Sequence, residues 1–125
     1  MTRNHSNRFL LTTLAIGLLL SYRSAALAHA ILLEASPAVD STVDGPNVSV
    51  KLRFNVRIDR SRSRLTLLLT DGKSATLVIK DDDSPDTLSA EATELARGAY
   101  HLRWQVLASD GHITRGEIPF WVSSP

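Results

Sequence analysis

The fold is decided by residues 100–106, which have the sequence Tyr-His-Leu-Arg-Trp-Gln-Val. Apolar and polar side chains alternate along this stretch, and a period of two places them on opposite faces of a β-strand. The even-numbered side chains, including Trp104, are therefore expected to face a core. The odd-numbered ones, including His101, are expected to face water. Asp110-Gly111 follows as a turn signal that ends the strand.

The same alternation occurs on both sides of this strand. Residues 48–54 alternate in the same way, and over residues 65–70 three leucines at odd positions alternate with Thr66, Leu68 and Thr70. Asp71-Gly72 is a tight-turn dipeptide, so residues 75–80 are predicted to return as the partner strand of a hairpin. A short strand is predicted over 87–90, and a last one over 113–122.

Two details of the last strand are predicted from its residue types. Pro119 has no N–H to donate to a ladder, so its stretch is expected at a sheet edge or in a bulge. Trp121 has outward parity. After residue 28 no window has a convincing helical period, and turn signals separate the strands. The sequence therefore predicts an all-β, Greek-key β-sandwich or barrel of about seven strands, in one domain over 29–125.

The first 28 residues are typical of a secretory signal peptide. Arg3 and Arg8 precede an apolar run over 9–20, and Ala26-Leu27-Ala28 provides a small-x-small cleavage site. A membrane anchor is the alternative, but a spanning helix needs about 20 apolar residues. We expect cleavage after Ala28, which makes His29 the first residue of an exported, periplasmic chain. Ala28-His29-Ala30 also fits a cleavage site, and cutting there would discard His29.

Composition excludes several kinds of site. The 125 residues include no Cys and one Met, which is Met1, so disulfides, cysteine metal sites and thioether sites are ruled out. Residues 29–125 carry 11 basic and 13 acidic side chains, which argues against nucleic-acid binding.

Two places in the sequence offer metal ligands. An N-terminal His29 would present its α-amine and its imidazole to one ion, and both bind metal in the neutral form. In Asp110-Gly111-His112, the two outer side chains point to the same side of an extended segment. Together these groups give three nitrogens and one oxygen, a set that favours tetragonal Cu(II), although Zn(II) could use it tetrahedrally. Each piece alone is more often a chance N-terminal His or a plain turn.

At these residues the chain resembles the CopC-type periplasmic copper-binding proteins. The resemblance covers nearly all of 29–122 and is carried by residues 29–38, 50–54 and 98–112, followed by Gly116 and by Phe120-Trp121-Val122. It implies an Ig-like Greek-key β-fold that binds Cu(II) in copper homeostasis or resistance, alongside an inner-membrane partner of the CopD type. By motif, His29 corresponds to the amine and imidazole ligand, Asp110 to the carboxylate ligand and His112 to the second imidazole.

Three departures from the family pattern narrow this expectation. Some members have a His where Ile31 stands here, and some have an acidic residue where Val56 stands. Others carry a Met-rich Cu(I) site, for which a chain beginning at His29 has no Met. We therefore expect one Cu(II) per chain rather than a two-site shuttle.

Two other function classes stay open. One is an Ig-like structural or interaction module without metal, which cleavage after Ala30 would favour. The other is a copper monooxygenase with an N-terminal His brace, although such enzymes are larger and have long loops that form a flat substrate face. The short loops here argue against such an enzyme, and we expect a binding protein that is not an enzyme. We also expect it to be monomeric.

Overall fold

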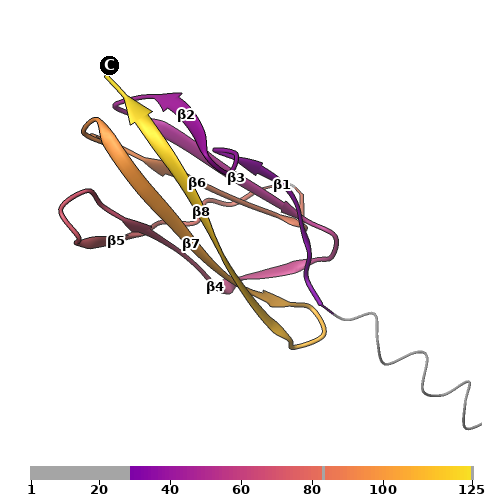
Figure 1. The fold of residues 1–125 in the computed structure, drawn as a ribbon. Helices are drawn as coiled ribbons and strands as arrows, with labels where there is room; N and C mark the ends of the chain where they lie inside the picture. The colour runs from indigo at the N-terminus through magenta and orange to yellow at the C-terminus, as the bar shows by residue number, and fades with distance from the viewer. Residues whose placement is uncertain (1–28, 83, 125) are drawn as a thin grey trace, which may run out of the picture.

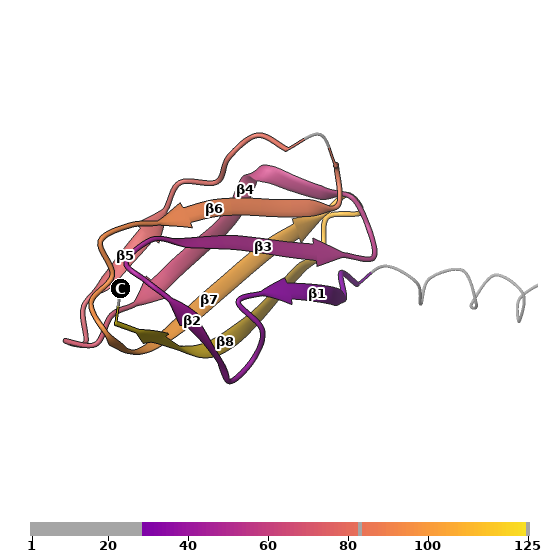
Figure 2. The same ribbon diagram turned by 90° about the horizontal axis from the view of Figure 1, so that it is seen from above.

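Two facing β-sheets make up the computed structural model, which describes residues 29–82 and 84–124 (Figures 1 and 2). The strands are β1 (Leu32–Ser36), β2 (Ser41–Asp44), β3 (Val48–Phe54), β4 (Ile58–Leu68), β5 (Ser74–Leu77), β6 (Thr87–Ala92), β7 (Gly98–Ala108) and β8 (Ile113–Ser123). One sheet has the order β1-β3-β6, and the other has the order β2-β8-β7-β4-β5. The predicted signal peptide, residues 1–28, lies outside the described residues.

The strands with alternating sequences form where the sequence predicts them. β3 has the predicted bounds, and β7 extends the predicted strand by two residues at each end. All four predicted inward side chains of residues 100–106 are buried. β4 and β5 pair antiparallel, and the Gly72 N–H donates to the Leu69 carbonyl at 3.1 Å in the predicted turn. The all-β sandwich prediction is confirmed.

Two strands and part of a third were not predicted. β1 has no alternating burial, and β2 is only four residues long and pairs parallel with β8. β4 begins at Ile58 rather than Leu65, and its pairing with β7 is irregular between Asp59 and Arg64. Local pattern does not reveal these segments because neighbouring strands, rather than their own apolar face, hold them in place.

Pro119 fits the edge prediction but not the bulge. The register of β7 with β8 is unbroken from Leu107–Ile113 to Gly98–Val122. The Asp40 N–H donates to the Pro119 carbonyl at 2.7 Å, on the side away from β7. The backbone nitrogen and oxygen of a strand residue point to the same side of the strand. The nitrogen of Pro119 therefore also faces away from β7, toward β2. Because β2 pairs with β8 only from Phe120 onward, no ladder bond from Pro119 is missing there. Proline thus costs no ladder bond with β7.

The core lies between the two sheets. Phe54 of β3 is fully buried and meets Trp104 of β7 edge-on, with ring centroids 5.3 Å apart. The Trp104 ring lies across Gly116 of β8, where a Cβ would come within 2.2 Å of Cζ2. Trp121 is 42% exposed, as its parity predicts. The described residues contain no helix that is long and apolar enough to cross a membrane.

Candidate metal centre

Three segments meet at one end of the sandwich. Figures 1 and 2 show the start of the described chain beside the turn that joins β7 to β8. The Ile31 N–H donates to Oδ1 of Asn55 at 2.7 Å, and the Asn55 N–H donates to the Ile31 carbonyl at 3.0 Å. The Ser109 N–H donates to the Arg57 carbonyl at 3.1 Å. The loop after β3 is therefore tied both to the N-terminal segment and to the β7–β8 turn.

The β7–β8 turn is closed by its own backbone. The Ala108 N–H donates to the His112 carbonyl, and the Gly111 N–H donates to the Ala108 carbonyl, both at 2.9 Å. Gly111 has a φ of 91°, which other residues rarely adopt. The Asp-Gly-His sequence thus forms the predicted turn and presents both outer side chains at its tip.

The structure brings the three predicted site residues together. The imidazoles of His29 and His112 lie edge to face, with ring centroids 5.1 Å apart and planes at 70°. Nδ1 of His112 lies 3.0 Å from Oδ2 of Asp110, and the His112 N–H donates to Oδ1 of the same carboxylate at 3.1 Å. The first and last of these residues come from opposite ends of the described chain.

The Asp110 carboxylate is held in its charged form. The hydrogen bond from the His112 N–H, followed by the contact with the His112 imidazole, lowers the pKa of Asp110 below its ordinary value. Because Nδ1 of His112 faces this carboxylate, Nε2 is the ring nitrogen left for another partner. A carboxylate that orients a histidine in this way commonly supports a metal-binding imidazole, and the lone pairs that its oxygens keep allow it to bind an ion as well.

The donor atoms of His29, Asp110 and His112 lie near one another but are not arranged around a common position that an ion could occupy. Within residues 29–82 and 84–124, no three histidine, aspartate or glutamate side chains are gathered closely enough to hold an ion. Metal–nitrogen bonds of about 2.0 Å place two bound imidazole nitrogens about 3–4 Å apart. Exposed rings with centroids at 5.1 Å can reach that spacing by side-chain rotation. The chemistry of these donors therefore fits a metal ion, and binding one would require the two rings to move closer together.

His101 lies away from this end, on the outward face of β7 as predicted. Its Nδ1 is 2.7 Å from Oε1 of Glu117, but the contact lacks hydrogen-bond geometry. The sequence did not suggest this pairing, because it does not reveal the β7–β8 register, in which Glu117 lies directly opposite Arg103 and His101 lies opposite Pro119.

Sequence analysis also missed Asn55, whose side chain and backbone both bond to Ile31. Its place directly after β3 is the one signal that could have indicated a role at the strand end.

Comparison with known proteins gives a consistent result. The CopC domain matches residues 32–123. Copper resistance protein C of Xanthomonas campestris pv. juglandis is 28% identical over 107 residues, covering 79% of this chain and 84% of the relative.

Two solved structures share the fold over most of the chain. CopC from Methylosinus trichosporium OB3b superposes with a TM-score of 0.69 at 36% identity, covering 77% of this chain and 95% of that one. PcoC from Escherichia coli, a methionine-rich copper resistance protein, superposes with a TM-score of 0.62 at 25% identity, covering 77% of this chain and 100% of that one.

Proposed function

The chain belongs to the CopC domain family, and from this premise we propose that it binds one Cu(II) ion through His29, Asp110 and His112. Relatives described above are copper resistance proteins by name, which supports a role in copper handling. The observation that carries the proposal is the contact between the His29 and His112 imidazoles, 5.1 Å apart at the end where Asp110 also lies.

The donor set favours Cu(II). With a free terminus, the α-amine and Nδ1 of His29 close a six-membered chelate ring on one ion. His112 adds a second imidazole, and Asp110 adds an anionic oxygen. Three nitrogens and an oxygen suit a tetragonal Cu(II) ion, whereas Cu(I) favours sulfur. The chain has no Cys, and Met1 is its only Met, which contrasts with the relative described as methionine-rich.

The proposal requires processing of the N-terminus. Residues 1–28 act as a signal peptide, cleavage after Ala28 exposes the His29 amine, and the mature protein works in the periplasm. There it buffers copper or passes it to a CopD-type inner-membrane protein, as a monomer and without catalysing a reaction. Cleavage after Ala30 would remove His29 and leave an Ig-like module without this site.

A one-residue extension tests the terminus. Adding Gly before His29 keeps every side chain but moves the amine away from the imidazole. We expect Cu(II) affinity in a competitive titration to fall by more than the roughly 10–100-fold typical of losing a supporting group. Electron paramagnetic resonance should show the loss of one nitrogen ligand. A Gly added after Pro125 is the matched control and should change neither result.

Intact-mass measurement of the exported protein completes the test, because it shows whether His29 is the first residue. Equal affinity with and without the extension would rule out the amine as a ligand. A mature chain that starts at Ile31 would overturn the proposal as a whole.

A further inference from the structure

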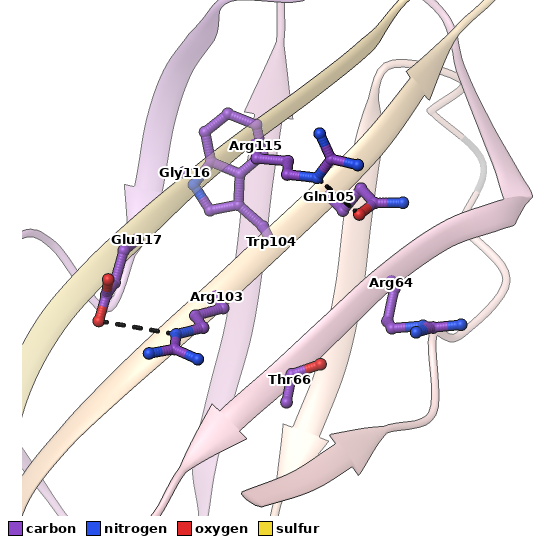
Figure 3. A pocket seen from close by; sticks show the side chains of 8 residues that line it. All are labelled: Arg64, Thr66, Arg103, Trp104, Gln105, Arg115, Gly116 and Glu117. Carbon is purple, nitrogen blue, oxygen red and sulfur yellow. Dashed lines mark hydrogen bonds and ion pairs between the residues drawn. The ribbon is translucent and has the colours of Figure 1, made fainter.

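A groove on the outer face of the five-stranded sheet concentrates positive charge. It has a volume of about 500 Å³ and is lined by side chains of β4, β7 and β8 (Figure 3). Three of these are arginines, Arg64, Arg103 and Arg115, and one is an acid, Glu117. Residues 29–125 carry more acidic than basic side chains, so their formal net charge is negative. The groove, by contrast, has a net positive charge.

The strand register brings the arginines together. Arg64, Gln105 and Arg115 form one row across the three strands, and Thr66, Arg103 and Glu117 form the next. Neighbouring strands are about 4.8 Å apart, so the backbones of Arg64 and Arg115 lie about 10 Å apart across two strand spacings. Arg103 lies on the strand between them, in the next row. β7 is paired on both sides at Arg103, whereas β2 does not extend to Arg115 of β8 and β5 does not extend to Arg64 of β4. The charge of Arg103 therefore does not serve to protect a sheet edge.

Two of the groove arginines, Arg64 and Arg115, lack an ion pair, as do Arg57 and Arg97 outside the groove among the residues that the structure describes. Arg53 pairs with Glu34 at 2.9 Å, and Arg62 pairs with Asp59 at 3.8 Å. Arg60 donates to the carbonyl oxygens of Ser84 and Thr87.

The existing contacts orient two of the guanidinium groups, and only Arg103 has an acidic partner. Nε of Arg115 donates to Oε1 of the neutral Gln105 at 2.9 Å. Nε of Arg103 is 4.0 Å from Glu117, whose carboxylate also lies 2.7 Å from Nδ1 of His101. Figure 3 shows Arg103 between Thr66 and Glu117, and Gln105 between Arg115 and Arg64. The guanidinium groups of Arg64 and Arg115 therefore have no acidic partner among the described residues, and that of Arg103 shares Glu117 with His101.

We propose that this groove binds a small polyanion that carries at least two carboxylate or phosphate groups. A guanidinium fork matches such groups with two parallel hydrogen bonds. Three forks spread over two rows suit several anionic groups better than one. Thr66 and Gln105 add neutral hydrogen-bonding groups between them. The site is separate from the copper ligands and does not depend on the proposed function.

Citrate binding to the copper-free protein, measured by calorimetry at low salt, tests the proposal. We expect citrate to bind at least about tenfold more tightly than inorganic phosphate, and acetate to bind more weakly than either. Arg64→Gln and Arg115→Gln should each weaken citrate binding by about tenfold. Arg115→Lys should give an intermediate loss, because it keeps the charge but not the fork.

Two further variants separate the groove from net charge. Arg62→Gln makes the same change of charge on the same strand but outside the groove, and should leave citrate binding nearly unchanged. Glu117→Gln should strengthen it, because the one carboxylate facing the ligand is removed.

Several results would overturn the proposal: no citrate binding, phosphate binding as tight as citrate, or equal losses in Arg62→Gln and Arg64→Gln. Cu(II) titration of Arg64→Gln should match the unchanged protein. This groove and the proposed copper site can therefore fail independently.

Discussion

At the scale of single residues, two histidines of the same domain have different surroundings. His112 sits at the tip of a turn, with Nδ1 against Asp110 and its ring against His29. His101 lies on a strand face, with Nδ1 against Glu117. Of these two, only His112 has a second imidazole beside it, and for that reason we propose His112, and not His101, as a copper ligand.

Substitution of each residue in turn separates these roles. We expect His112→Ala to lose most of the Cu(II) affinity, because an imidazole is a strong equatorial donor. Asp110→Asn should lose less, since the amide keeps an oxygen near His112 but not its charge. His101→Ala is the matched histidine control and should lose little. Competitive titration, with circular dichroism as a check on folding, measures all three. Equal damage in His101→Ala and His112→Ala would move the site to the face of β7.

At the scale of elements, the pairing of β7 with β8 positions three features of the molecule: the β7–β8 turn, the arginine groove and the contact between Trp104 and Gly116. It places the predicted turn at one end of the sandwich and the arginine groove on its outer face. It also sets Trp104 directly opposite Gly116, so that the indole ring lies over the backbone of β8 and contacts Phe54 of the facing sheet. The ring leaves no room for a side chain at position 116.

Gly116→Ala tests this packing. The new Cβ would lie within 2.2 Å of the indole, so the ring has to shift. Forced repacking of this kind typically costs about 1–3 kcal/mol of the free energy of unfolding. Urea denaturation should show that loss, and the loss should be smaller when Gly116→Ala is made in a Trp104→Phe background. Equal losses in both backgrounds would mean that Trp104 is not what excludes the methyl group.

At the scale of the whole molecule, carboxylates held by hydrogen bonds lead us to expect a fold that loses stability in acid. The pKa values of Glu34, Asp59, Asp82, Glu91 and Asp110 all lie below their ordinary values. For Glu91 the main cause is the hydrogen bond from the Ser49 hydroxyl, followed by the one from Lys80. The folded protein therefore binds fewer protons than the unfolded chain in the acid range, and its stability rises with pH there.

Thermal unfolding of the copper-free protein between pH 6 and pH 3 measures this effect. We expect Tm to be nearly constant above the ordinary glutamate pKa of 4.5 and to fall as the pH drops below it. Glu91→Gln has no carboxylate at this position to protonate, so acid cannot remove the stabilising effect of its charge. The Tm of this variant should therefore fall less steeply than that of the unchanged protein. A Tm that rises on acidification would contradict the assigned direction of these pKa values.

The sequence by itself determined the strands whose side chains alternate, the hairpin turn at Asp71-Gly72 and the three residues proposed as copper ligands. Such features are local, because a period of two or an Asp-Gly-His turn is contained in a few neighbouring residues. Only the tertiary structure decided the positions of β1 and β2, which depend on pairing with distant strands. It alone placed His29 beside His112 and gathered three arginines from three strands into one groove. Contacts between residues far apart in the chain depend on strand order and register, and no local pattern specifies these.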